Sequence, residues 1–239
     1  MNEQQAWNPI RIFIGADERQ PVALTTLHDS IVWRSSRTVA VTVLRTSQLP
    51  VKRRGLTDFT FTRFLVPWLC NYQGIGVFMD ADILVTGDIA ELVECSSIFD
   101  DVQVMQDQPR FEWPSVMLFN NTRCKALTPE FIENPANNLF DLKWARSIGK
   151  LPKEWNACVG YTDVPGAKLY HFTQGVPVWP ETKGNFDEDA LWLRQHRHAN
   201  ATVPWKDLMG NSVHAEQTLK RQALRTLDSR VEFVSNAHN

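Results

Sequence analysis

The stretch Val77-Phe78-Met79-Asp80-Ala81-Asp82 places two carboxylates, two residues apart, directly after a run of apolar side chains. The apolar run predicts a buried strand over Gly74–Met79. Side chains two apart in extended backbone point to the same face, so both acids face one small volume. Two anions this close repel each other, and a divalent cation with oxygen ligands removes that conflict. The stretch predicts a metal site beyond a strand's carboxyl end, where open α/β sheets bind ligands; alternatively, the Asp residues only turn the chain.

The residues upstream predict a strand, a helix and a second strand. The apolar run Ile10–Ile14 ends at Gly15-Ala16-Asp17, which predicts a buried strand followed by a tight loop. Pro21–Arg34 carries apolar residues near helical spacing, and Thr38–Leu44 alternates and is rich in Val and Thr. Strand, helix and strand within about 35 residues are typical of a right-handed βαβ unit. This order predicts an α/β fold with parallel strands.

Further elements are predicted along the chain. A helix from about Thr57, capped by Thr57 or Asp58, carries one apolar stripe with Arg63 at its edge, and Pro67 kinks or shortens it. The other predicted elements are a short helix at Ile89–Glu94, strands at Val102–Met105, Val116–Phe119 and Lys168–Phe172, and helices at Asp187–Arg197 and Ala215–Leu227. We therefore expect one domain over residues 1–186 and a helical extension over residues 187–239 that packs on it.

Composition excludes several classes of protein. The 25 basic residues nearly balance the 27 acidic ones, which argues against a nucleic-acid partner. The four cysteines have no Cys-x-x-Cys spacing, which favours reduced thiols in a cytoplasmic protein. No apolar run reaches the ~20 residues that a membrane-spanning helix needs. We expect a soluble cytoplasmic protein, with contact to a membrane surface and the oligomeric state left open.

A second candidate segment runs from Tyr170 to Trp179 and contains His171 and Gly175. An imidazole beside two carboxylates suits Mn²⁺ better than Mg²⁺, which prefers oxygen ligands. Gly175 lets backbone N–H groups approach a phosphate. A structural histidine is the alternative.

The basic loop Lys52-Arg53-Arg54 is interpreted as solvated, with contact to phosphate or an anionic membrane as the other option.

Taken together, the chain resembles a GT-A-fold glycosyltransferase, closest to glycosyltransferase family 8, which includes glycogenin and bacterial lipopolysaccharide glucosyl- and galactosyltransferases. The resemblance is carried by Ile12–Asp17, Phe61–Pro67, Phe78–Leu92, Val116–Asn120 and the His171 loop. It implies a Rossmann-like, mixed and mostly parallel sheet flanked by helices, with residues 1–186 as the catalytic domain. It also implies transfer of a hexose from a nucleotide sugar, UDP-hexose by the family pattern, to the hydroxyl of a carbohydrate or other acceptor, with retention of configuration.

The resemblance also assigns roles to individual residues. Asp80, Asp82 and His171 would hold Mn²⁺ (or Mg²⁺) against the diphosphate of the nucleotide sugar. The residues implied to bind the donor are Ala16 and Asp17 near the base or ribose, Arg63 near the diphosphate or sugar, Ala81, Gly175 and Lys183. The catalytic set is Asp80, Asp82, Arg63 and Asp141, the last as the counterpart of an Asp-Gln pair in the family.

Two departures from the family pattern bear on the site. The loop after His171 lacks the usual phosphate-binding lysine, for which Lys183 and Lys168 are candidate substitutes. Trp113-Pro114-Ser115 replaces a small Asn-Ala-Gly segment, which alters the sugar pocket.

Two other functions stay open: a HAD-type phosphatase with Asp80 as nucleophile, and a nucleotide-sugar-binding scaffold that has lost catalysis.

Overall fold

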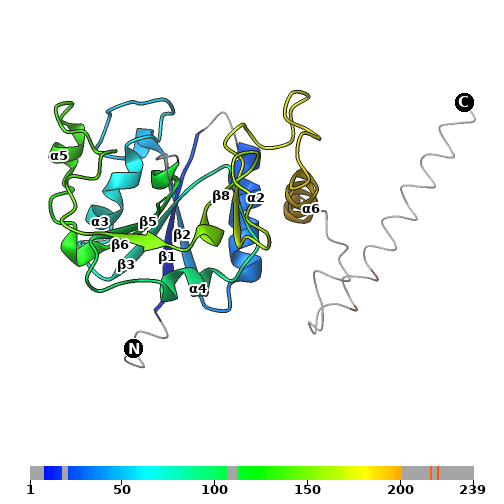
Figure 1. The fold of residues 1–239 in the computed structure, drawn as a ribbon, viewed down its shortest axis with the longest axis horizontal. Coiled ribbons are helices and arrows are strands. Elements are labelled where there is room, and N and C mark those ends of the chain that lie inside the picture. The colour runs from blue at the N-terminus through cyan, green and yellow to red at the C-terminus, as the bar shows by residue number, and fades with distance from the viewer. Residues whose placement is uncertain (1–7, 18–20, 107–111, 201–215, 217–219, 221–239) are drawn as a thin grey trace, which may run out of the picture. The chain divides into compact units, whose positions relative to one another are not determined.

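A six-stranded mixed sheet forms the centre of the computed structural model, which describes residues 8–17, 21–106, 112–200, 216 and 220 (Figure 1). The strand order is β2-β1-β3-β6-β5-β7. The strands are β1 (Ile10–Gly15), β2 (Val39–Leu44), β3 (Ile75–Asp80), β5 (Val102–Met105), β6 (Val116–Asn120) and β7 (Ile148–Leu151). β1 is parallel to β2 and β3, and β5 to β7, whereas β6 is antiparallel to both its neighbours. The predicted α/β fold with a mostly parallel central sheet is confirmed.

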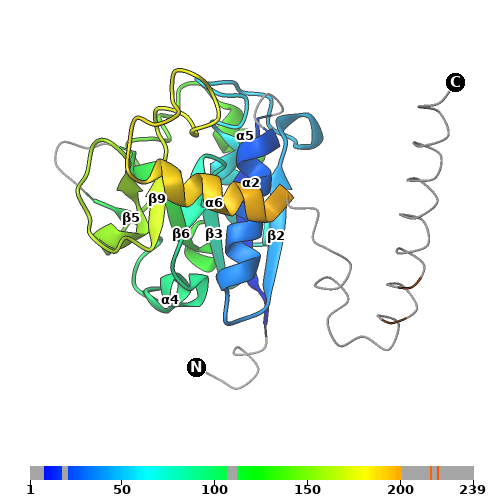
Figure 2. The same cartoon turned by 90° about the vertical axis from the view of Figure 1, so that its right-hand side faces the viewer.

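Both faces of this sheet are covered, because its central strands send apolar side chains to either side. In β1, Ile12 and Ile14 join one core with Leu27, whereas Phe13 joins the opposite core with Phe64. The helices α2 (Pro21–Arg34) and α6 (Asp189–Asn200) contribute to the first core, and α3 (Val66–Leu69) and α5 (Pro129–Glu133) to the second (Figures 1 and 2). The carboxyl ends of β1 and β3 therefore lie at one edge of a sheet that has an apolar core on each face.

A second sheet brings the distant histidine to the acidic motif. It has the order β4-β9-β8, with β4 (Ile83–Val85), β8 (Ala157–Cys158) and β9 (Leu169–His171). β4 follows the two aspartates at once and pairs antiparallel with β9, so that Ile83 lies opposite His171. The N–H of Phe172 then donates to the carbonyl of Asp82 at 3.0 Å. Strand pairing thus fixes the position of residue 171 beside residue 82.

The helix expected from Thr57 starts later. A 3₁₀ turn covers Thr62–Leu65 and continues into α3, with Pro67 inside the first turn, where a proline is tolerated. The predicted N-cap at Thr57 or Asp58 is wrong, because the Thr60 hydroxyl donates to the Thr57 carbonyl at 2.8 Å and accepts the Thr57 N–H at 2.9 Å. Local threonine bonds of this kind compete with helix formation.

Other elements lie close to their predicted places. The helix α4 (Ile89–Glu94) has the predicted bounds, and the Asp88 carboxylate caps it by accepting the Ala90 N–H at 2.9 Å. The bounds of the other predicted strands shift by one residue at some ends, whereas α5, β7 and β8 fall in a region where we expected little regular structure.

The last described helix, α6, begins at Asp189 and packs against α2. Its Gln195 accepts a hydrogen bond from Arg34 at 2.7 Å, and its buried Trp192 joins the core.

The expected helix over residues 215–227 lies outside the described residues, apart from Glu216 and Lys220, which are helical. The domain boundary at residue 186 stays a prediction. In the part of the chain that is described, no helix combines the length and the apolarity that crossing a bilayer requires.

Candidate metal and donor site

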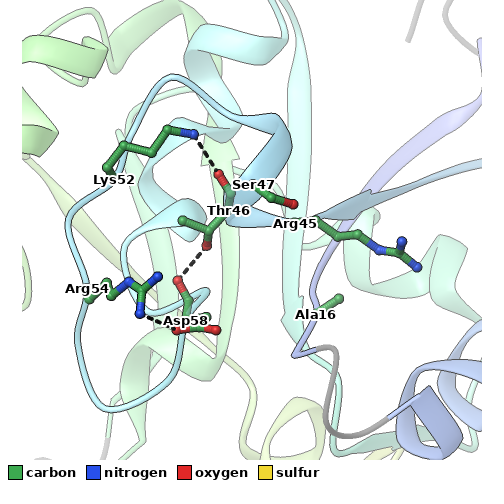
Figure 3. Close-up of a pocket in the computed structure, with 7 residues that line it drawn as sticks. All are labelled: Ala16, Arg45, Thr46, Ser47, Lys52, Arg54 and Asp58. Carbon is green, nitrogen blue, oxygen red and sulfur yellow. Dashed lines mark hydrogen bonds and ion pairs between the residues drawn. The ribbon is translucent and has the colours of Figure 1, made fainter.

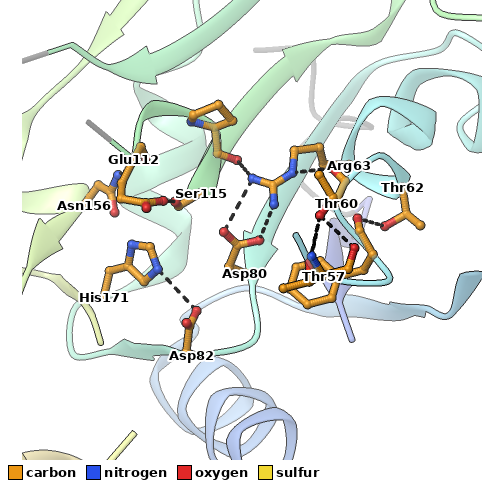
Figure 4. A network of polar contacts seen from close by, with 12 residues as sticks. Thr57, Thr60, Thr62, Arg63, Asp80, Asp82, Glu112, Ser115, Asn156 and His171 are labelled. Atoms are coloured by element: carbon orange, nitrogen blue, oxygen red, sulfur yellow. Dashed lines mark hydrogen bonds and ion pairs between the residues drawn. The ribbon is translucent and has the colours of Figure 1, made fainter. Parts of the chain in front are cut away.

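Asp80 lies at the carboxyl end of β3 and is held by Arg63. The arginine Nη2 donates to Asp80 Oδ1 at 2.9 Å, and its Nη1 faces Oδ2 at 3.4 Å (Figure 4). Nη1 also donates to the Pro114 carbonyl at 2.7 Å, and Nε to the Thr60 carbonyl at 3.0 Å. Arg63 and Asp80 are both buried. This arrangement makes Arg63 a fixed cation that orients the Asp80 carboxylate.

Asp82 lies two residues further on and faces His171. Its Oδ1 is 3.3 Å from His171 Nε2, close enough for an ion pair (Figure 4). The other ring nitrogen of His171, Nδ1, lies 3.9 Å from the Cys158 Sγ. Nε2 is therefore the ring nitrogen that faces Asp82 and is the candidate metal ligand.

The electrostatics of this cluster favour added positive charge. Burial raises the pKa of Asp80 to about 6, even though the charge of Arg63 acts in the opposite direction. Burial by itself lowers the pKa of His171, but the Asp82 carboxylate, together with Cys158 and Asp80, outweighs burial and holds this pKa well above its ordinary value of 6.5. Each raised pKa means that the side chain holds its proton more tightly. A bound proton reduces the negative charge of the cluster, as a metal cation would.

Glu112 also belongs to the cluster, and our sequence analysis missed it. Ligand atoms of Asp80, Glu112 and His171 all lie within 4.8 Å of one another. Glu112 has a left-handed backbone, with φ 49°, and its Oε2 accepts a hydrogen bond from the Ser115 hydroxyl at 2.7 Å. No strand or motif marks this glutamate in the sequence. The one available signal was its place directly before the unusual segment Trp113-Pro114-Ser115.

Two buried oxygens at this place fit a cation. Asp82 Oδ1 lacks a well-aligned hydrogen bond despite its closeness to His171, and Asn156 Oδ1 lacks a partner among the described residues. Buried polar atoms are normally satisfied, so each such atom needs an explanation. Carboxylate oxygens with one imidazole form a donor set suited to Mn²⁺. The residues present therefore fit a divalent metal ion.

Ala16 and Asp17 follow β1, next to the acidic motif, because Gly15 pairs with Asp80 across the sheet. Asp17 is buried. Ala16 lines a pocket of about 280 Å³ (Figure 3). The other residues that line it are Arg45, Thr46, Ser47, Lys52, Arg54 and Asp58. This pocket has a basic rim and lies at the carboxyl end of β1.

The basic loop at this pocket is tied to the body of the protein, so the solvated loop that we predicted is only partly correct. Lys52 Nζ donates to the Leu49 carbonyl at 2.7 Å. Arg53 Nη1 donates to the carbonyls of Ile132, Asn134 and Asn137 at 3.0–3.1 Å, and its guanidinium lies 4.1 Å from the centre of the Phe61 ring. Arg54 remains exposed beside Asp58. Arg53 therefore has a structural role that its charge did not reveal.

A second pocket, of about 370 Å³, adjoins the cluster through Glu112. It is also lined by Trp113, Pro114, Asn138, Phe140 and Asp141. Asp141 accepts the Lys143 N–H at 3.0 Å and pairs with the Lys143 ammonium at 3.3 Å. The structure thus places Asp141 in one pocket with Glu112.

The remaining predicted residues lie around the cluster or away from it. Ala81 is buried between the two aspartates. Gly175 has φ 103°, and its N–H donates to the Phe172 carbonyl at 2.8 Å, so this N–H is already used within the loop. Lys183 is exposed. Lys168 forms an ion pair with Glu91, a residue of helix α4, so the Lys168 ammonium group lies at that helix.

Comparison with known proteins places the chain in a family. No family model matches it. It is 31% identical over 232 residues to Protein CDI of Arabidopsis thaliana, an alignment that covers 80% of this chain and 88% of that protein. The chain belongs to the Protein CDI family.

Similarity to solved structures shows which fold this chain has. The apo form of the glycosyltransferase GlyE of Streptococcus pneumoniae TIGR4 matches with a TM-score of 0.56 and 15% identity, over 90% of this chain and 64% of GlyE. The galactosyltransferase LgtC in complex with donor and acceptor sugar analogues matches with a TM-score of 0.54 and 11% identity, over 82% of this chain and 98% of LgtC. In other matches the chain spans 60% of GlyE and 51% of the bifunctional WbbM. This CDI-family chain therefore has the GT-A glycosyltransferase fold.

Proposed function

We propose that the protein is a metal-dependent glycosyltransferase, similar to family 8, that moves a hexose from a UDP sugar to an acceptor hydroxyl with retention. The observation that carries this proposal is the geometry at the carboxyl end of β3 in a GT-A fold, where His171 lies 3.3 Å from Asp82 and has a ligand atom within 4.8 Å of one of Asp80. These three residues would hold Mn²⁺ or Mg²⁺. The structure of LgtC, which has the same fold, contains donor and acceptor sugar analogues.

In the reaction, the bond between the anomeric carbon and the diphosphate oxygen breaks, and a bond from the acceptor oxygen to that carbon forms. The proton of the acceptor hydroxyl goes to the departing diphosphate. Asp80, Asp82 and His171 would hold a divalent cation here, and its charge would neutralise the negative charge that grows on this leaving group. Arg63 keeps the Asp80 carboxylate oriented for that task through two contacts, and such preorganised charge is the main catalytic contribution expected of the protein.

The two pockets suggest which end of the donor lies where. The pocket beside Ala16 adjoins the end of β1 and would take the nucleoside, with Asp17 near the base or ribose. The pocket that contains Glu112 and Asp141 would take the transferred sugar and the acceptor. Lys183, in the loop after His171, would approach the diphosphate, whereas Gly175, whose N–H already donates to Phe172, would only let the backbone of this loop come close to it.

All four cysteines are free, which supports a reducing, cytoplasmic location.

Thermal unfolding with UDP and Mn²⁺, each alone and together, tests this function. A ligand present at about 100 times its Kd stabilises the folded state by ~2.7 kcal/mol. For a domain of this size that raises Tm by roughly 5–11 °C. We expect the rise only when both are present, and we expect Asp82→Asn to abolish it. Asp163→Asn, which removes an exposed carboxylate in a loop, is the matched control.

Each alternative has its own result in the same experiment. Stabilisation by phosphate analogues with Mg²⁺, and none by UDP, would favour a phosphatase, which the GT-A fold and the pairing of Asp80 with Arg63 argue against. Metal-dependent UDP binding without release of UDP from any UDP sugar would favour a scaffold that has lost catalysis. For an active enzyme, a product of inverted configuration by NMR would contradict retention.

A further inference from the structure

We propose that Glu112 is a ligand of the same metal ion and that it allows the protein to bind the ion before any nucleotide arrives. The proposal rests on the metal site of the proposed function and adds a carboxylate that the Asp-x-Asp and His pattern does not contain. It follows from the position of Glu112, from an unsatisfied buried oxygen beside it, and from the charge of the cluster.

Position is the first argument. The ligands of one divalent ion lie about 2.0–2.6 Å from it, so no two are more than about 5 Å apart. Ligand atoms of Asp80, Glu112 and His171 meet this condition, since all lie within 4.8 Å of one another. Asp80 can take part although Arg63 binds it, because a carboxylate offers about four lone-pair positions.

The second argument is Asn156, which lies directly before β8 and has no exposed surface. Its Nδ2 donates to the Glu112 carbonyl at 2.9 Å, whereas its Oδ1 is buried without a partner among the described residues. Figure 4 shows this side chain beside Glu112, on the same side of the cluster as His171. An amide oxygen in this place is a suitable ligand for a hard cation.

Glu112 is also held in place. The Ser115 hydroxyl, itself fully buried, donates to Glu112 Oε2 at 2.7 Å, and the Asn156 amide fixes the backbone carbonyl. Ser115 engages one carboxylate oxygen, and because a carboxylate offers about four lone-pair positions, this hydrogen bond leaves Glu112 able to bind a cation. The segment that replaces a small Asn-Ala-Gly sequence therefore supports an additional acidic residue.

Charge gives the third argument. Asp80, Asp82 and Glu112 carry three negative charges when ionised, and Arg63 supplies one positive charge. An imidazole that binds a metal ion must give up its extra proton, so His171 then adds no charge and the remainder is −2, which one divalent cation balances. Without Glu112 the remainder is −1, and the diphosphate would have to complete the balance. With Glu112 as a ligand, we therefore expect the protein to bind the metal ion in the absence of a nucleotide.

The test is titration of the full chain with Mn²⁺ alone, followed by the loss of the EPR signal of free Mn²⁺. We expect one bound ion in the unmodified protein and at least tenfold weaker binding in Glu112→Gln. Glu112→Asp keeps the charge but shortens the reach, so it should also bind weakly if Glu112 is a ligand. Asp141→Asn removes a charge from the same pocket and should change the affinity by less than threefold. The Tm of each variant without metal shows that it is folded.

Two results would overturn the inference. One is equal Mn²⁺ affinity in Glu112→Gln and the unmodified protein; the other is full affinity in Glu112→Asp, which would reduce the role of Glu112 to its charge. Both leave the proposed function intact if UDP binding still requires Mn²⁺ and Asp82. Loss of that requirement in the unmodified protein would instead refute the proposed function itself.

Discussion

Replacement of Arg63 by methionine should destabilise the protein strongly. The side chains of Arg63 and Asp80 are only 8% and 10% exposed, and the guanidinium also bonds the carbonyls of Thr60 and Pro114. Methionine keeps the approximate length but leaves a buried carboxylate and two carbonyls without their donor. Removal of one partner from a buried pair costs about 3–5 kcal/mol. We therefore expect Tm to fall by roughly 6–20 °C.

A double-mutant cycle separates the pair from general damage. Asp80→Asn in the Arg63→Met background removes the uncompensated charge, so the double variant should be more stable than the sum of the single effects predicts by about 1–3 kcal/mol. Urea unfolding in EDTA, followed by tryptophan fluorescence, measures all four proteins without metal. Additive losses, or a loss below 1 kcal/mol for Arg63→Met, would refute the view that Arg63 is the fixed partner of Asp80.

Other predictions concern the frame of the site. Gly15→Ala should cost about 1–3 kcal/mol in urea unfolding, because an added Cβ would lie 2.3 Å from Phe59 Cδ2; an unchanged midpoint would contradict this close approach. Thr128→Ala should cost about 1 kcal/mol, because the Thr128 hydroxyl caps α5 by accepting the Phe131 N–H at 3.2 Å, and equal stability would rule out that cap. A thiol reagent should modify Cys95 first in the native protein, since Cys95 is half-buried whereas the other three cysteines are buried; equal rates at several thiols would contradict this.

The parts of the fold that sequence reasoning predicted well are those with strong local patterns. The strand, helix and strand from Ile10 to Leu44 have clear periodicity, and the acids at Asp80 and Asp82 mark the end of an apolar strand. The helix from Thr57 was misplaced because apolar spacing alone does not reveal that the Thr60 hydroxyl bonds the Thr57 backbone. The signal for α5 was available in Thr128-Pro129, an N-cap followed by a proline in the first turn, and we overlooked it.

The parts of the site that local patterns do not specify depend on contacts between distant segments. The position of His171 beside Asp82 follows from the pairing of β9 with β4. We named His171 as a candidate ligand from its residue type and from the family resemblance, without knowledge of this pairing. Glu112 joins the cluster because a left-handed turn and the Ser115 hydroxyl direct it there, and neither can be read from residue types. The structural role of Arg53 is likewise set by three carbonyls about 80 residues away.

The most direct test of the account is the anomalous scattering of manganese in crystals grown with Mn²⁺ and UDP. We expect one strong peak about 2.0–2.4 Å from carboxylate oxygens of Asp80 and Asp82 and near His171 Nε2, with the diphosphate on its open side. Bound UDP with no manganese peak at these residues, or a peak elsewhere, would contradict the claim that this cluster holds the metal.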